Sequence, residues 1–225
     1  MNYRGEKKDF KNRSKKKTGI LVTVTMIVGI VLAALLIKIV PAALGIGLLV
    51  SGAASAKPEV YRDISDYQQF IGPKHLAKYL FQDPCEIFPQ ELADAVVPVE
   101  FQFVYYNPWD AQYVTYLTLQ YRDEEYEKEL ERLSAIGIED YTSFYSVTGE
   151  PEGYNLVAMD ADKYYGFIYA MIPEKADGTI TYAGIQFCNY FLDLDIQDYL
   201  PGKYLLSGFD ASIENPYRGK MVQKH

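Results

Sequence analysis

The chain opens with a long apolar pattern that differs from everything after it. Residues 19–37 carry no charged side chain and are rich in Ile, Val, Leu and Ala. A helix over these 19 residues would be roughly 28 Å long, close to the ~30 Å hydrocarbon core of a bilayer. The run also lacks the polar stripe that a helix packed on a globular domain shows. The pattern predicts a transmembrane helix over residues 18–38.

A second apolar run, residues 39–56, follows Lys38 and contains Pro41 and several glycines. Three interpretations compete for it. In the first, it is a Gly/Ala-rich juxtamembrane segment after a single span, and Lys38 reaches the outer interface. In the second, it is a second span that returns the chain across the membrane. In the third, Ala54-Ser55-Ala56 is a cleavage site at which the rest of the chain is released. The single span is preferred. A second span needs a very short turn, and a 56-residue signal peptide with an internal lysine does not match the usual pattern.

From residue 57 onward the pattern changes to alternation with a period of two. Residues 99–105 and 113–121 alternate in this way on either side of a turn at residues 107–110, which predicts an antiparallel hairpin. Further runs rich in aromatic and β-branched residues are predicted as strands at 143–147, 154–159, 164–172 and 179–191. Asp177-Gly178 favours a hairpin between the last two runs, which are apolar on both faces and are therefore expected to be central.

Two helices are predicted beside these strands. The clearer one covers residues 124–136, with Asp123 as its cap and Gly137 at its end. A shorter one covers residues 63–71, and Asp63 or Ser65 can cap it. Residues 57–225 are thus expected to form one α+β domain. Its antiparallel sheet has about five to six strands with flanking helices and is preceded by the N-terminal transmembrane helix.

Charge then orients the chain. The basic tail, residues 1–17, holds eight basic and two acidic side chains, whereas residues 57–225 hold 13 basic and 28 acidic ones. Basic residues next to a span stay in the cytoplasm. The tail is therefore predicted to be cytoplasmic and the domain extracytoplasmic, in a single-pass protein of the cell membrane. The acidic domain has no basic surface for phosphates, which argues against a nucleic-acid partner.

Catalytic and cofactor motifs are scarce. Apart from His225, the last residue, His75 is the only histidine of the domain, and no glycine-rich phosphate loop occurs. This argues against most zinc sites, a serine triad and nucleotide binding. Residues 160–162 begin like a calcium loop, but Tyr165 stands where the loop requires glycine. Asp193, Asp195 and Asp198 are interpreted as a strand end that leads into a helix N-terminus. We expect no metal, no cofactor and no catalytic constellation.

The only two cysteines, Cys85 and Cys188, both fall in the predicted outer domain. In an oxidising compartment they could form one disulfide, worth about 4 kcal/mol for a loop of about 100 residues. The alternative is two buried free thiols that act as small apolar side chains. The sequence does not separate these two interpretations.

Tyrosine is unusually frequent, with 21 residues in the chain. Tyr105, Tyr106, Trp109 and Tyr113 crowd around one predicted hairpin loop and form the candidate binding patch. Tyrosine combines an apolar ring with a polar tip, which suits both half-buried strands and binding surfaces. The patch is expected to contact a protein or glycan partner.

The order of basic tail, apolar segment and single domain resembles that of many small membrane-anchored proteins of bacteria, a likeness of architecture that carries over no functional residue. The sequence favours a non-enzymatic, membrane-anchored binding or scaffolding module of a bacterial envelope. Two alternatives stay open. One is an envelope hydrolase that acts through paired carboxylates. The other is an accessory subunit of a membrane protein complex, with the glycines of residues 39–56 on a helix–helix contact.

Overall fold

The computed structural model separates the chain into two compact units, residues 1–55 and 56–225. It describes residues 34, 35, 37, 39, 56–71, 86–93, 96–142, 144–163, 165–187, 193–212 and 215. Within these ranges no helix is long and apolar enough to cross a membrane. Most of the predicted transmembrane helix and juxtamembrane segment, both cysteines (Cys85 and Cys188) and His75 lie outside the described residues.

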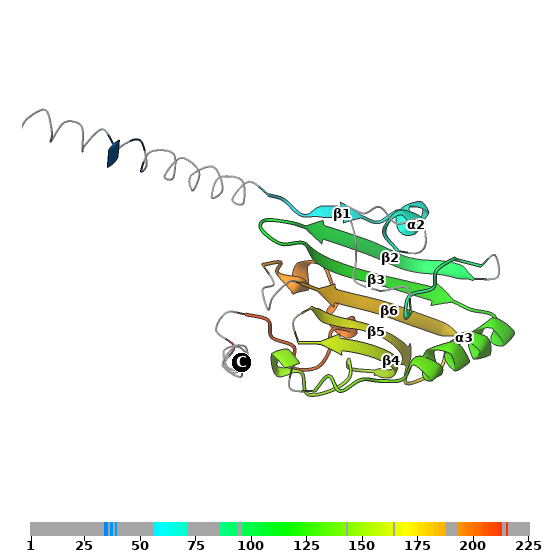
Figure 1. The fold of residues 1–225 in the computed structure, drawn as a ribbon. Helices are drawn as coiled ribbons and strands as arrows, with labels where there is room; N and C mark the ends of the chain where they lie inside the picture. Colours follow the sequence, from blue (N-terminus) through cyan, green and yellow to red (C-terminus); the bar gives the residue numbers. More distant parts are fainter. Residues whose placement is uncertain are drawn as a thin grey trace, which may run out of the picture. The chain divides into compact units, whose positions relative to one another are not determined.

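The second unit, here called the domain, is built on one six-stranded antiparallel sheet with the order β1-β2-β3-β6-β5-β4 (Figure 1). The strands are β1 (Glu59–Tyr61), β2 (Val97–Tyr106), β3 (Gln112–Gln120), β4 (Tyr154–Asp162), β5 (Gly166–Pro173) and β6 (Thr179–Gln186). Both predicted hairpins, β2–β3 and β5–β6, are present. Strands β5 and β6 are interior strands of the sheet, as the apolar residues on both of their faces predicted. The α+β class and the strand number are confirmed.

Helices are few and mostly short. The α-helices are α2 (Tyr67–Phe70) and α3 (Asp123–Ile136), and the 3-10 helices are η1 (Ile64–Asp66), η3 (Phe144–Ser146), η4 (Ile196–Asp198) and η5 (Gly202–Tyr204). After the β2–β3 hairpin, α3 leads the chain to the far edge of the sheet, where β4 begins. Strands β5 and β6 then return to the centre, where β6 pairs with β3.

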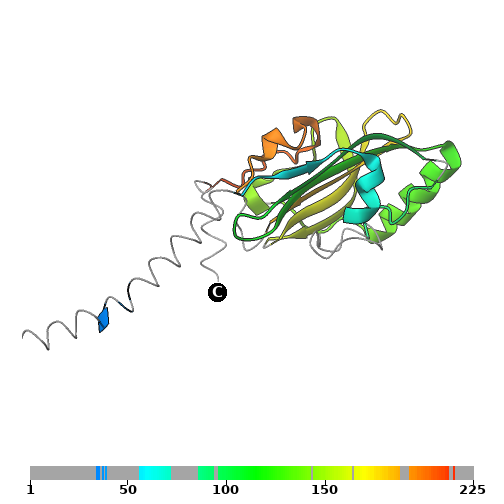
Figure 2. The ribbon, with the colours of Figure 1, turned by 90° about the horizontal axis from the view of Figure 1, so that it is seen from above.

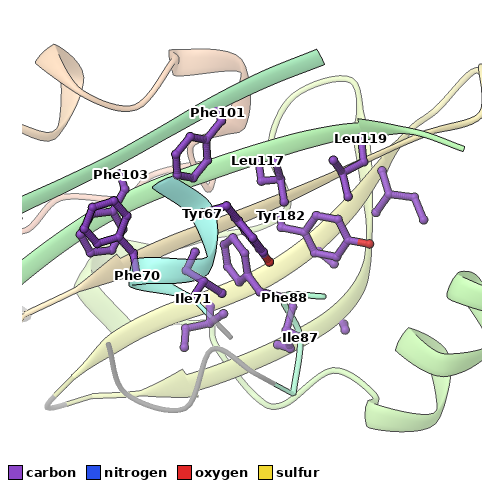
Figure 3. Packing of buried hydrophobic residues seen from close by; sticks show 14 of the residues in the cluster. Tyr67, Phe70, Ile71, Ile87, Phe88, Phe101, Phe103, Leu117, Leu119 and Tyr182 are labelled. Carbon is purple, nitrogen blue, oxygen red and sulfur yellow. The ribbon is translucent and has the colours of Figure 1, made fainter. Parts of the chain in front are cut away.

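Both faces of the sheet are buried, each under a different part of the chain. On the first face α2, residues 87–88 and α3 cover a core in which the Phe70 and Phe103 rings stack at 4.3 Å (Figure 3). We call this the first core. The second core lies on the opposite face of the sheet, under residues 144–147 and the C-terminal segment, residues 193–212. Figure 2 shows these two layers on opposite sides of the sheet. The domain is therefore a three-layer arrangement whose middle layer is the sheet.

Four local predictions need correction. The predicted strand at 143–147 is wrong, because Phe144–Ser146 forms η3 with Tyr145 in a left-handed conformation (φ 50°, ψ 40°). The Tyr145 ring is fully buried against Phe187, so burial of the ring outweighs the strand preference of the segment. The strand predicted to reach residue 191 ends at Gln186 in the described part of the chain. Asp123 lies in the first turn of α3, whose N-cap is Arg122. Strand β1 was not predicted at all.

The edges of the sheet are partly closed to further strands. On β4, the Leu156 amide donates to the Glu150 carboxylate at 3.1 Å and the Met159 amide donates to the Gly137 carbonyl at 2.9 Å. At the other edge β1 pairs with residues 103–105 of β2. The rest of β2, which pairs with no other described strand on this side, holds Pro98 and an adjacent bulge. Proline and bulges both discourage pairing with another chain. These edges are therefore poorly suited to the addition of another strand.

Candidate binding site

The predicted aromatic patch is divided between the two faces of the sheet. Tyr105 and Tyr113 stand opposite each other on β2 and β3 with ring centroids 5.5 Å apart, and they are only 8% and 7% exposed within the first core. Tyr106 points to the other face and packs against the second core. Trp109, in the loop of the hairpin, is 58% exposed. The structure thus brings together two of the four residues, and binding by any of them stays a prediction.

Burial also affects the hydroxyl of one member of this pair, Tyr113. It raises the pKa of Tyr113 to about 12, and the neighbouring Tyr105 adds to the effect. A hydroxyl with this pKa stays neutral at physiological pH. The low exposure of both rings shows that the pair packs within the first core, and Trp109 is the most exposed member of the predicted patch.

A different set of tyrosines meets on the second face of the sheet. Tyr116 comes from β3, Tyr154 from the start of β4 and Tyr204 from the end of η5. The Tyr204 ring lies between the other two, with centroids 5.6 Å from Tyr116 and 5.7 Å from Tyr154. Tyr204 is buried, while Tyr116 and Tyr154 are half-buried. We call these three residues the tyrosine cluster.

Hydrogen bonds from the sheet hold Tyr204 in place. Its hydroxyl donates to Glu100 Oε2 at 2.9 Å and lies 3.1 Å from Thr118 Oγ1, which in turn pairs with Thr181 at 2.9 Å. Its carbonyl accepts from the Tyr169 hydroxyl at 2.6 Å. Because both the side-chain hydroxyl and the backbone carbonyl of Tyr204 are hydrogen-bonded, the residue is preorganised and would lose little conformational freedom on contact with a ligand.

Two opposite charges border the tyrosine cluster at the surface. Lys203 Nζ lies 4.5 Å from the centre of the Tyr204 ring and 3.8 Å from Glu100 Oε1. The two charged side chains are 52% and 42% exposed. The adjacent Tyr204, and then Glu100, raise the pKa of Lys203. Burial, followed by Glu100, raises the pKa of Tyr116. The site thus combines aromatic rings, an ammonium donor and a carboxylate acceptor within contact distance.

A second polar network joins α3 to the sheet. The Tyr182 hydroxyl donates to Glu129 Oε1 at 2.6 Å and lies 2.6 Å from the Tyr121 hydroxyl. Arg132 donates to both oxygens of Glu129 and to the Ile87 carbonyl. The Glu129 carboxylate is thus occupied by donors on both oxygens. We assign this network a structural role, because the Glu129 side chain is only 13% exposed and these hydrogen-bond partners all belong to the domain itself.

A hollow of about 410 Å³ lies beside the C-terminal segment and is lined by Asp193, Asp195 and Asp210. Each carboxylate already serves a local purpose. Asp195 caps η4 through the Gln197 amide, as the interpretation of a helix start predicted. Asp193 accepts from Gln112 at 2.6 Å, and Asp210 accepts from a backbone amide. The described residues contain no group of three or more acidic, histidine or cysteine side chains arranged to hold a metal ion.

Sequence patterns could have found only part of the tyrosine cluster. Alternation along residues 113–121 places Tyr116 on the face of the sheet opposite to Tyr113, so the sequence alone could have predicted the face on which Tyr116 lies. Tyr204 follows no strand or helix pattern, and its partners are about 50 and 90 residues away in the sequence. Only the fold brings these rings together.

Comparison of the chain with protein-family models, with curated proteins and with solved structures gives no match. The function is therefore inferred from the geometry of the domain and from the pattern of the sequence.

Proposed function

We propose that the chain is a non-enzymatic binding module tethered to the membrane of a bacterial envelope. The uncharged run of residues 19–37 and the basic tail before it support a single span with the N-terminus in the cytoplasm and the domain outside. On this proposal the tether keeps the domain at the membrane, and the domain supplies the contact with a protein or glycan partner.

The observation that carries the binding part is the tyrosine cluster with its bordering charges. Fixed tyrosine rings offer apolar area at low entropic cost, and their hydroxyls add hydrogen bonds, a combination typical of recognition surfaces. Glu100 and Lys203 add an acceptor and a donor beside the rings. Such a site suits a partner with both apolar and hydrogen-bonding groups, as peptides and amino sugars have.

Protease accessibility tests the tether and its orientation. Protease added to intact spheroplasts should digest the domain of the full chain, because the proposed single span places it outside. Digestion that requires permeabilised membranes would replace this topology with the two-span interpretation of residues 39–56.

Site-specific photo-crosslinking tests the tyrosine cluster. A photoreactive amino acid that replaces Tyr116 in the full chain should trap a discrete partner in cells, either a protein band or a glycan ladder. The matched control carries the same amino acid at Glu127, an exposed position on α3. A further Lys203→Glu change should abolish the adduct at position 116. The same adducts at both positions would contradict recognition by the cluster.

The alternative of a carboxylate hydrolase keeps one supporting observation, the hollow lined by three aspartates. It predicts that the full chain cleaves envelope glycan or peptide and that Asp193→Asn abolishes cleavage. Unchanged cleavage in this variant, or no cleavage by the native chain, would leave the binding module as the better proposal.

A further inference from the structure

The exposed large aromatic side chains of the domain gather at one end of the sheet. Among the large hydrophobic residues that the structure describes as exposed, two are aromatic: Trp109 at 58% and Tyr165 at 39%. Trp109 lies in the loop between β2 and β3, and Tyr165 in the turn between β4 and β5. Both connections lie at the same end of the strands. The residues that pair with one another across the sheet at this end are Tyr105, Tyr113, Gln186, Gly166 and Asp162. Trp109, Tyr165 and their two turns are called the aromatic end.

The chain also enters the domain at this end. Glu59, the first residue of β1, stands opposite Tyr105, and the two strands are antiparallel. The residues before Glu59 therefore run toward the β2–β3 loop, as Figure 1 shows for the start of β1. The apolar run of the sequence ends at Ala56. The three residues from Ala56 to Pro58 can span about 10 Å at most.

We propose that the aromatic end rests in the lipid–water interface of the membrane to which the chain is tethered. This inference relies on the proposed membrane tether. Tryptophan and tyrosine concentrate at this interface because their rings are apolar and their polar tips stay hydrated. Residues 39–56 carry no charged side chain, so they keep Ala56 close to the membrane surface both as a juxtamembrane segment after a single span and as a second span.

The charged residues at the aromatic end indicate whether the contact depends on anionic lipid headgroups. The two turns and the entering chain carry Lys57 and Lys163, but also Glu59, Asp110 and Asp162. This balance does not attract anionic headgroups, so the contact depends on the aromatic rings. It should therefore be the same on zwitterionic and anionic bilayers and should persist at high salt, which screens electrostatic binding. A contact that appears only on anionic bilayers and disappears in salt would overturn the proposal.

Trp109 is the only tryptophan of the chain, so the native fluorescence reports this position alone. The full chain is placed in phosphatidylcholine nanodiscs whose acyl chains carry bromine either near the headgroup or near the terminal methyl. We expect emission at shorter wavelength than in the unfolded chain and strong quenching by the shallow bromine, with weak quenching by the deep bromine. Absence of quenching by either lipid, in a chain that floats with the nanodiscs, would overturn the proposal and leave the tether intact.

A matched variant moves the single tryptophan to the opposite end of the sheet. In Val97→Trp/Trp109→Phe the fluorophore sits at the exposed start of β2, far along the strand from the β2–β3 loop. We expect no quenching of this variant by either lipid. Equal quenching of both proteins would also overturn the proposal, because it would show no preferred end. A chain that does not float with the nanodiscs at all would instead refute the membrane tether, and this inference with it.

Discussion

Gly166 provides the sharpest test of the described geometry, because it begins β5 at the row of residues that supports the aromatic end. Its φ of +105° lies in a region that favours glycine. A Cβ at this position would lie 2.0 Å from the backbone oxygen of Ile185 on β6. Real Cβ atoms do not approach so closely, so Gly166→Ala requires β5 and β6 to separate locally.

The expected loss of stability in Gly166→Ala has two contributions, and substitutions at two other glycines separate them. Gly153 has a φ of +80° with no atom near its missing Cβ, so Gly153→Ala should cost only the left-handed backbone, roughly 1–2 kcal/mol. Gly202 has neither feature, and Gly202→Ala should be neutral or stabilise by about 0.4–1 kcal/mol. Gly166→Ala adds an overpacking cost of about 1–3 kcal/mol, for a total of about 2–5 kcal/mol.

Urea unfolding of residues 57–225, followed by circular dichroism, measures the three free energies of unfolding. The order of destabilisation should be Gly166→Ala, then Gly153→Ala, then Gly202→Ala, with similar urea dependence for all three. Equal costs for Gly166→Ala and Gly153→Ala would mean that β5 and β6 do not approach as closely as described, and would refute the reasoning.

Three further predictions concern aromatic side chains. The Tyr126 hydroxyl is buried without a hydrogen-bond partner among the described residues, so Tyr126→Phe should be neutral or stabilise the domain by about 1 kcal/mol, while Tyr182→Phe should cost about 1.5–3 kcal/mol in the same urea assay. Trp109→Ala should change stability by less than about 1 kcal/mol, because the ring is exposed, whereas Phe103→Ala in the core should cost about 3–5 kcal/mol. Burial raises the pKa of Tyr113 from 10.0 to about 12, so the folded state keeps a proton that the unfolded state loses. The domain should therefore lose stability as pH rises from about 10 to about 12, and Tyr113→Phe should make this decline shallower in unfolding experiments across that range.

The strands could be predicted from the sequence where local patterns, such as alternation and turn residues, determine them. Alternation along residues 99–105 and 113–121 predicts which side chains share a face, and Tyr105 and Tyr113, each in an apolar position of its run, do pair on one face. Asp177-Gly178 likewise marked the β5–β6 connection. In each case the information is local, because strand period and turn chemistry act over a few residues.

Prediction failed where distant partners decide the outcome. Tyr145 occupies a left-handed turn because its ring fills a place against Phe187 and its hydroxyl donates to the Lys163 carbonyl at 2.6 Å. Strand β1 has three residues and depends entirely on the free edge of β2. The candidate patch around Trp109 was assembled from neighbours in sequence, although consecutive residues of a strand point to opposite faces. Applying that rule would have separated Tyr105 from Tyr106.

The two proposed surfaces together define an orientation for the domain. Glu100, beside the tyrosine cluster, lies five residues before Tyr105 on β2, which is about 17 Å along a strand. With the aromatic end in the bilayer interface, the cluster would lie on a face of the sheet at some distance from the membrane surface. A tether alone would let the domain sample many orientations, whereas a second contact restricts them. Because restricted freedom lowers the entropic cost of the next encounter, loss of Trp109 and Tyr165 should weaken capture of a membrane-associated partner in cells without changing the affinity of the isolated domain.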